Sequence, residues 1–257
     1  MKKVEHSAAL LQLRDHAWAH MPRIAVTVFK QVFKTTTPIG TAFLLGSTKN
    51  ITLVTAGHVL EECLAVRDLQ EGSAYFFVDY QQTCPIFGRH LVLPDVDIGV
   101  VHLAHPIARL ASRRNVARPL DLNSVRQLQP HGRADAFVMT GTPLNRVKAS
   151  AAEKKVNVYP ASVVTFEHSP EVYRALGVEP KQRLVVEFDR KSINGDGKMM
   201  PRPTGMSGGP LWGAYPNGLG AWSYFLSGVL IEHHKQEDAV VCSRITSVLK
   251  AIEMLEE

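Results

Sequence analysis

The sequence is poor in cysteine, and this narrows the class of protein to which it can belong. Its 257 residues include only three cysteines, Cys63, Cys84 and Cys242. An odd and low number argues against the disulfide framework that stabilises many small secreted domains. A chain of this length buries enough apolar surface to fold without such bridges. We therefore expect no structural disulfide.

Long hydrophobic runs are also absent. No stretch of about 18 apolar residues occurs, which argues against a transmembrane helix. In residues 1–22, charged residues and histidines interrupt the apolar ones, whereas a signal peptide needs an unbroken apolar stretch of about 7–15 residues. Leucines in the same segment fit one face of a helix. We predict a helical N-terminal extension over residues 1–22 and a cytoplasmic protein that has no membrane partner.

The basic residues are not gathered into runs. The net charge is +5, but the lysines and arginines are scattered and do not alternate with aromatic residues. Nucleic-acid binding usually needs a clustered basic patch, so we expect no nucleic-acid partner. The histidines and acidic residues do not match the spacing of a zinc site, and we predict neither a metal nor an organic cofactor.

Short apolar runs between turn residues dominate the chain from residue 23 onward. Many short strands without long helices between them predict an all-β fold, a sandwich or a barrel. Helices are expected near residue 56 and over residues 246–256. The weakly patterned segment 105–132 reads as a connection between two halves. The predicted strands are residues 24–29, 41–45, 51–55, 74–78, 98–103, 136–140, 156–164, 184–188, 224–231 and 239–245.

The strongest chemical signal is a serine between glycines, Gly205-Met206-Ser207-Gly208-Gly209-Pro210. Acyl transfer needs a hydroxyl at an exposed bend and two backbone N–H groups aimed at the developing oxyanion. Glycine permits the backbone angles of such a bend. The pattern predicts Ser207 as a nucleophile and the N–H groups of Gly205 and Ser207 as an oxyanion hole. A glycine-rich turn with an idle serine is the alternative.

Two further segments supply partners for such a nucleophile. In Thr55-Ala56-Gly57-His58 an apolar strand runs into small residues and then a histidine, the usual base for a serine. Further along the chain, Asp97 opens an apolar strand and could orient that histidine. Asp95 is the rival. We favour Asp97 because the hydrophobic run follows it directly.

Together the three segments resemble the signature segments of trypsin-like serine proteases. They occur in that family's order of His, Asp and Ser, which differs from the order in subtilisins and α/β-hydrolases. The resemblance spans roughly residues 23–250. It implies two six-stranded antiparallel β-barrels, the first over residues 23–118 with His58 and Asp97, the second over residues 119–257 with Ser207 and the C-terminal helix. It implies a serine endopeptidase acting on protein or peptide substrates.

Two departures place the chain nearer the disulfide-free bacterial and viral-type members. Secreted zymogens carry an aspartate just before the serine, which pairs with a newly cut N-terminus; Met206 stands there instead. A cysteine often follows the family's histidine, and here the residue is Val59. A conditionally activated protease with an activating protein partner, and a non-catalytic binding module of the same fold, remain alternatives.

Substrate preference depends on the segment before the nucleophile and on the strand after it. Trypsin places an acid six residues before the serine, but Pro201 occupies that position, so cleavage after Lys or Arg is not expected. An apolar pocket lined by Met199, Met200 and Val229 is our first prediction. A polar pocket supplied by Lys198, Arg202, His233 and His234 is the second. The predicted substrate-binding residues are Met200, Pro201, Thr204, Ile231, Glu232 and His233.

Overall fold

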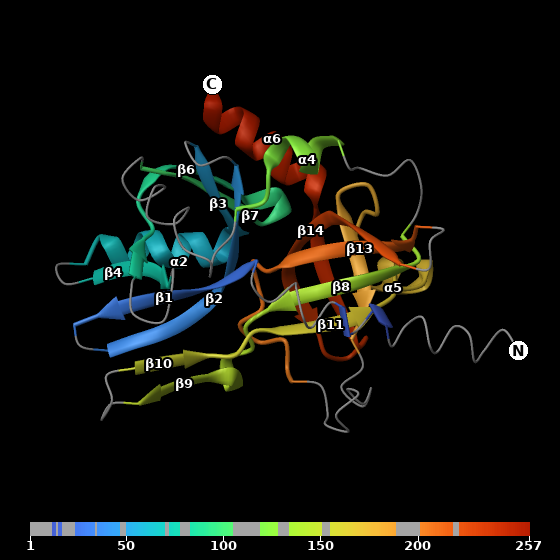
Figure 1. Cartoon of the computed structure of the whole chain (residues 1–257), viewed down its shortest axis with the longest axis horizontal. Helices are drawn as coiled ribbons and strands as arrows, with labels where there is room; N and C mark the ends of the chain where they lie inside the picture. Colours follow the sequence, from blue (N-terminus) through green and yellow to red (C-terminus); the bar gives the residue numbers. More distant parts are fainter. Residues whose placement is uncertain are drawn as a thin grey trace, which may run out of the picture.

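Two antiparallel β-sheets make up most of the protein. The computed structural model describes residues 12–13, 15–16, 24–33, 35–46, 50–69, 72–77, 83–104, 119–127, 134–150, 155–188, 201–217 and 221–257. The all-β fold predicted from the sequence is confirmed, and Figure 1 shows the two sheets side by side. Of the predicted N-terminal extension, Gln12, Leu13, Asp15 and His16 are helical, and Leu13 is completely buried.

The first sheet contains the strand that precedes His58 and the strand that follows Asp97. Its order is β5-β4-β1-β2-β3-β7-β6, and every neighbouring pair is antiparallel. Seven strands are present rather than six, because the three-residue β5 adds to the edge at β4. The strands are β1 (Ala25–Val32), β2 (Thr35–Gly46), β3 (Ile51–Ala56), β4 (Gly72–Phe77), β5 (Thr83–Pro85), β6 (Gly88–Leu93) and β7 (Ile98–Leu103).

The second sheet has six strands in the order β11-β8-β13-β14-β15-β12. A bridge between Glu167 and Val186 joins the segment after β11 to β12, so the two edges of the sheet meet and close a barrel. A separate hairpin, β9 (Val147–Ser150) and β10 (Lys155–Val158), lies before β11. The strands of the barrel are β8 (Ala136–Gly141), β11 (Ala161–Thr165), β12 (Arg183–Glu187), β13 (Pro210–Pro216), β14 (Trp222–His234) and β15 (Ala239–Arg244).

Side chains between the sheets hold the two halves together. The C-terminal helix α6 (Ile245–Glu256) follows β15 directly, yet it packs against β6 and β7 of the first sheet as well as β14 of the second. Its apolar side recurs at helical spacing through Val248, Ile252 and Leu255, all buried. One apolar cluster contains these residues together with Phe43 of β2 and Trp212 of β13. Burial of this shared cluster fixes one sheet against the other.

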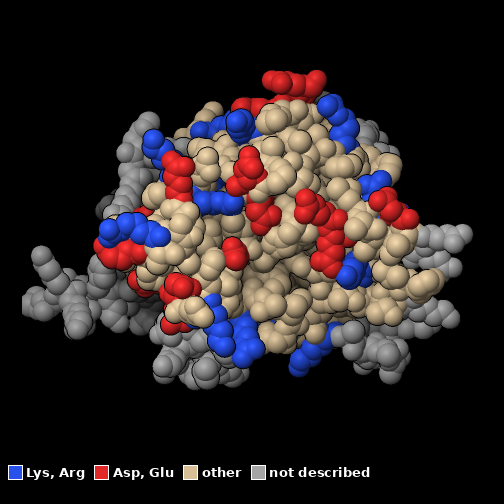
Figure 2. All heavy atoms as spheres, turned by 180° about the vertical axis from the view of Figure 1, so that it is seen from behind, with Lys and Arg blue, Asp and Glu red and all other residues tan. Residues whose placement is uncertain are grey.

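Short helices complete the fold. They are α2 (Gly57–Arg67), α4 (Leu122–Gln127), α5 (Pro170–Ala175) and the 3₁₀ turns η2 (Pro94–Val96) and η3 (Leu144–Arg146). Within the described ranges no helix is long and apolar enough to cross a bilayer. On the face seen in Figure 2, acidic and basic side chains are interspersed over a mainly uncharged surface.

Candidate functional site

His58 stands where β3 passes into helix α2. The strand is buried throughout, and the chain turns at Ala56, so the histidine is the second residue of the helix. A side chain at Gly57 would place its Cβ 2.7 Å from Oδ1 of Asp97. The absence of a side chain at Gly57 therefore allows the end of β3 to lie close to the turn that carries Asp97.

Asp97 contacts His58 through both carboxylate oxygens. Oδ1 accepts from the His58 backbone N–H at 2.8 Å, and Oδ2 lies 2.8 Å from Nδ1 of the ring. A carboxylate oxygen only accepts, so Nδ1 carries the proton and Nε2 is left as the basic nitrogen. Asp97 adopts a left-handed backbone, φ +48°, directly after η2. Asp95, the rival, accepts a hydrogen bond from Arg183 through its backbone carbonyl, and among the described residues it forms no hydrogen bond or ion pair with His58.

The contact between His58 and Asp97 also shifts their pKa values in opposite directions. The side-chain hydrogen bond to Asp97 raises the pKa of His58 above 6.5, against the lowering effect of burial. Burial by itself would raise the pKa of Asp97, but the hydrogen bonds from His58 outweigh it and the pKa falls below its ordinary value. Each residue thus favours the charged form of the other.

Ser207 lies in a tight turn that packs against the strands before His58. Its backbone carbonyl accepts from the N–H of Thr41 on β2 at 2.8 Å. The next residue, Gly208, has φ +88°, and a Cβ there would lie 2.0 Å from the Thr41 carbonyl oxygen and 2.9 Å from the Ala56 nitrogen. Only glycine fits so close to the other sheet. The turn therefore brings Ser207 next to the end of β3, where helix α2 begins with Gly57 and His58.

Some polar groups of this turn are hydrogen-bonded to described residues, and two backbone N–H groups are not. The Ser207 hydroxyl donates to the backbone oxygen of Ile231 on β14 at 3.2 Å, and no hydrogen bond joins Ser207 to His58 among the described residues. The N–H groups of Gly205 and Ser207 make no hydrogen bond to any described residue. The neighbouring N–H of Met206 donates to Pro203, and that of Gly208 donates to Leu230. Two backbone donors beside the hydroxyl are thus left for a ligand.

A small cavity of about 20 Å³ opens beside Ser207. Its walls are mainly apolar, and Glu232 lies at its exposed rim with its carboxylate 3.2 Å from Nε2 of His234. The His233 ring meets the buried Phe188 edge to face, at 5.2 Å between centroids. The lining residues are Met139, Pro203, Met206, Ser207, Leu230, Ile231, Glu232, His233 and Val240.

Three of the six predicted substrate-binding residues line this cavity: Ile231, Glu232 and His233. Pro201 is buried and Thr204 is exposed, but neither lines it. Val229, also expected in an apolar pocket, is buried in the cluster between the sheets. Met200, together with Lys198 and Met199, lies outside the described residues.

Sequence reasoning missed several cavity residues, among them Met139 and Leu230. Met139 reaches the cavity because β8 pairs with β13, where Met139 lies opposite Leu211 four residues after the serine. Such a cross-strand pairing leaves no signal in a single sequence. Leu230, by contrast, adjoins the predicted Ile231 and could have been found from the strand pattern.

All three cysteines are buried thiols, and no disulfide joins them. Burial raises the pKa of the Cys63 and Cys84 thiols to about 12, and raises that of Cys242 as well. Thiols with such values are poor nucleophiles at neutral pH. In the described part of the chain no group of three His, Cys, Asp or Glu side chains could hold a metal ion.

Comparison with known proteins supports the fold alone. No protein-family model matches the sequence, and no curated protein matches it. Among solved structures, the chain is similar to "Structure of GrC", that of granzyme C, a serine protease of the chymotrypsin fold, with a TM-score of 0.55 and 15% sequence identity. The match covers 91% of this chain and 94% of that one. The two-sheet arrangement is therefore the one found in trypsin-like proteases.

Proposed function

We propose that the protein is a serine endopeptidase, with Ser207 as nucleophile, His58 as general base and Asp97 as the residue that orients His58. The carrying observation is the double contact between His58 and Asp97, 2.8 Å at the ring nitrogen and 2.8 Å at the backbone N–H. A histidine held in one tautomer, with its second nitrogen free, is what a serine nucleophile needs. The fold supports the proposal because trypsin-like proteases use the same arrangement of sheets.

In the proposed reaction, Ser207 Oγ attacks the carbonyl carbon of a peptide bond while Nε2 of His58 takes the hydroxyl proton. Asp97 stabilises the imidazolium that forms and keeps its own charge. His58 then gives the proton to the departing amine, and the acyl group stays on Ser207. Water, deprotonated by His58, attacks this ester and releases the new carboxyl terminus.

The Gly205 and Ser207 N–H groups are proposed to bind the oxyanion of both tetrahedral intermediates. The support for this role is that neither group donates a hydrogen bond to any described residue. Donors fixed in advance, beside the attacking hydroxyl, lower the energy of a developing negative charge without reorganisation.

We further propose a preference for a small apolar residue before the scissile bond. The cavity beside Ser207 has room for about one water molecule. Its walls include Met206 and Leu230, and none of the lysines and arginines that the structure describes lines it. Glu232 lies at the rim and pairs with His234, so it supplies no buried counter-charge for a substrate cation.

Cleavage of fluorogenic peptides tests the activity. Four peptides that differ only in the residue before the reporter (Ala, Leu, Glu and Arg) are incubated with the wild type and with Ser207→Ala. The proposal expects cleavage by the wild type alone, fastest for the Ala peptide. Equal cleavage by Ser207→Ala would overturn the role of Ser207, and cleavage of the Arg peptide alone would overturn the preference.

A conditionally activated form of the same enzyme is the second proposal. The hydrogen bond from Ser207 to Ile231 favours it, since that bond must break before the hydroxyl can reach His58. Hydrogen bonds of catalytic groups are often formed fully only when substrate binds, so the constitutive enzyme stays first. Peptide cleavage with and without added cell extract separates the two, because a triggered enzyme is active only with extract.

A further inference from the structure

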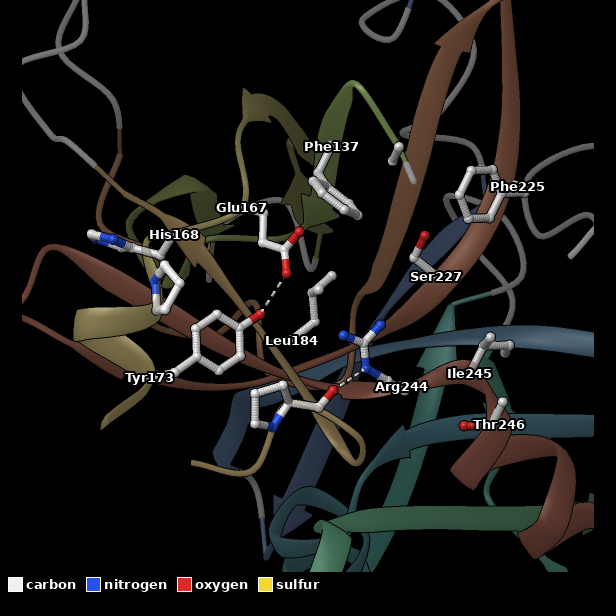
Figure 3. Close-up of a pocket in the computed structure, with 13 residues that line it drawn as sticks. Phe137, Glu167, His168, Tyr173, Leu184, Phe225, Ser227, Arg244, Ile245 and Thr246 are labelled. Carbon is white, nitrogen blue, oxygen red and sulfur yellow. Dashed lines mark hydrogen bonds between the residues drawn. The ribbon is translucent and has the colours of Figure 1, made fainter. Parts of the chain in front are cut away.

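A second cavity, larger than the one beside Ser207, lies in the second barrel at the end remote from Ser207. It has a volume of about 510 Å³, within the ordinary range of roughly 300–1,000 Å³ for small-molecule sites. Barrel mouths are common places for such sites. Figure 3 shows side chains from several strands and from α5 arranged around this space.

This cavity and the one beside Ser207 lie at opposite ends of the strands that line both of them. On β8, Phe137 lines the large cavity and Met139 the small one. On β14, Ser227 lines the large cavity and Ile231 the small one, four residues or roughly 13 Å further along the strand. The packed interior of the barrel, with Val186 and Leu211, lies between them. The large cavity is therefore separate from the proposed active site.

Aromatic and aliphatic side chains form most of its wall. Phe137 and Leu184 face it from the barrel interior, Phe225 closes one side, and Tyr173 of α5 closes another. A wall of this kind favours the apolar body of a ligand, because each buried Å² of apolar surface contributes about 25 cal/mol.

One cation, Arg244, enters the cavity from the end of β15. Its Nε donates to the Pro180 backbone oxygen at 2.7 Å, which fixes the direction of the guanidinium. Neither terminal nitrogen has a hydrogen-bond acceptor among the described residues. In Figure 3 these two nitrogens point into the space beside Leu184. A planar pair of donors suits a carboxylate.

A second polar group in the wall also lacks a partner. Ser227 is 8% exposed, and its Oγ has no hydrogen-bond partner among the described residues. The oxygen lies on the cavity side of β14, where a Cβ on Gly213 of the neighbouring strand would be 2.7 Å away. A buried hydroxyl without a partner costs roughly 1–3 kcal/mol, and a ligand oxygen placed here would remove that cost.

We propose that this barrel mouth binds a hydrophobic monocarboxylate, with its aryl or alkyl body against Phe137, Leu184 and Phe225. The carboxylate accepts from the terminal nitrogens of Arg244 and from the Ser227 hydroxyl. The site is independent of the proposed peptidase activity, since it shares no lining residue with the cavity beside Ser207.

The acid in the same wall, Glu167, does not reverse this choice of ligand. Its Oε1 accepts from the Tyr173 hydroxyl at 3.1 Å, and Tyr173 also binds the Val185 backbone N–H. In Figure 3 the side chain of Leu184 lies between Glu167 and Arg244. Glu167 therefore already holds a donor from the protein, whereas the terminal nitrogens of Arg244 hold no acceptor there.

Calorimetric titration of the full chain with 3-phenylpropanoate tests the proposal. Two probes of the same shape, 3-phenylpropanamide and 3-phenylpropylamine, replace the carboxylate by a neutral and by a cationic group. The proposal expects the carboxylate to bind most tightly, and to bind equally well after Ser207 is blocked by a fluorophosphonate or replaced by alanine. Tighter binding of the amine, or no heat from any probe at millimolar concentration, would overturn it.

Variants locate the binding. Arg244→Gln should weaken 3-phenylpropanoate binding roughly 10- to 100-fold, the loss of a charge-assisted hydrogen bond. Ser227→Ala removes a hydroxyl that has no protein partner, so it should weaken binding without lowering the melting temperature. Arg174→Gln is the matched control, because Arg174 is exposed on α5 and pairs with Glu171 at 3.0 Å. Equal affinity for Arg244→Gln and Arg174→Gln would contradict the site, and Ser227→Ala gives the same test if Arg244→Gln does not fold.

Discussion

Arg183, on strand β12 of the second barrel, donates from Nη1 to the backbone oxygen of Val96 at 2.7 Å, directly beside Asp97 in the first half of the chain. Its Nη2 donates to the Asp95 carbonyl at 2.8 Å, and Nη1 also reaches the Ser243 hydroxyl at 2.5 Å. The Ser243 hydroxyl donates to the same Val96 oxygen. Strands of the second barrel thus fix the turn that carries Asp97 and, through it, the orientation of His58.

Arg183→Met tests this fixing role. Loss of hydrogen bonds from a charged donor should lower the free energy of unfolding by about 1.5–3 kcal/mol. A misplaced Asp97 should lower kcat by up to about a hundredfold while KM changes little, since the substrate cavity is elsewhere. Arg174→Met, which removes an exposed arginine, serves as the control. Wild-type kcat and stability for Arg183→Met would show that the turn holds Asp97 without it.

The choice between the two aspartates can be decided by isosteric replacement. Asp97→Asn should lower kcat by about ten-thousand-fold, because the amide favours the wrong tautomer of His58. Asp95→Asn should change it less than about threefold, since only its backbone carbonyl is used. Circular dichroism of both variants checks that the fold is kept. The reverse ranking would make Asp95 the orienting residue.

The pH dependence of kcat/KM follows from the raised pKa of His58. The base must be neutral to accept a proton, so activity should rise with pH through a midpoint above 6.5. In Asp97→Asn the hydrogen bond and the charge of Asp97, which raise this pKa, are lost, while burial, which lowers it, and the weaker raising effect of Glu62 and Glu61 remain, so the midpoint of the residual activity should move to lower pH. A midpoint that is the same in both proteins would contradict the coupling of the two side chains.

The interaction between His58 and Asp97 should stabilise the fold over a limited pH range. The lowered pKa of Asp97 means that its contribution is present above 3.8 and is lost as the pH falls through the folded value. The raised pKa of His58 means that its contribution is present below 6.5 and is lost as the pH rises through the folded value. The stability difference between wild type and Asp97→Asn, measured by urea unfolding, should therefore be largest between these two values.

Gly205→Ala tests the proposed oxyanion hole. Gly205 has φ +92°, and a Cβ would lie 2.7 Å from Leu144 and 3.0 Å from the Thr142 carbonyl oxygen, so the peptide must tilt. Losing one oxyanion donor costs roughly 2.7–4 kcal/mol of transition-state stabilisation. Gly177→Ala is the matched control, since Gly177 also has a positive φ, +63°, with nothing within 4 Å of the added Cβ. Near-normal kcat for a folded Gly205→Ala protein would remove Gly205 from the site.

Much of the fold could be predicted because its strands are marked by apolar runs and turn residues. Residues 98–103 were predicted within the bounds of β7, whereas residues 156–164 were predicted as one strand and form two, β10 and β11. Pro160 lies between them and cannot donate a ladder hydrogen bond. Strand β6 was missed because Arg89 and His90 are exposed and weaken its apolar pattern. Helix α5 was missed although Ser169 and Pro170 are ordinary signals of a helix start.

In the candidate site, too, some residues could be predicted from local sequence patterns, whereas others depend on contacts between distant parts of the chain. His58, Asp97 and Ser207 stand out in the sequence because their chemistry demands small residues and strand ends beside them. The Arg183 contacts could not be predicted, since two of their acceptors are backbone carbonyls, which every residue has. The barrel-mouth cavity depends on Ser227 and Arg244, which come together only through the pairing of β14 with β15. Long-range strand register is the part of the structure that this single sequence leaves open.

The most direct measurement of the central claim is labelling by a fluorophosphonate, followed by intact mass spectrometry and peptide mapping. Such reagents react with a serine hydroxyl that is activated by a neighbouring base and faces an oxyanion hole. We predict one added phosphonyl group on Ser207 of the wild type, labelling slowed strongly in His58→Ala, and none in Ser207→Ala. No labelling of the wild-type chain, with or without cell extract, or labelling at another residue, would contradict the assignment of Ser207 as an activated nucleophile.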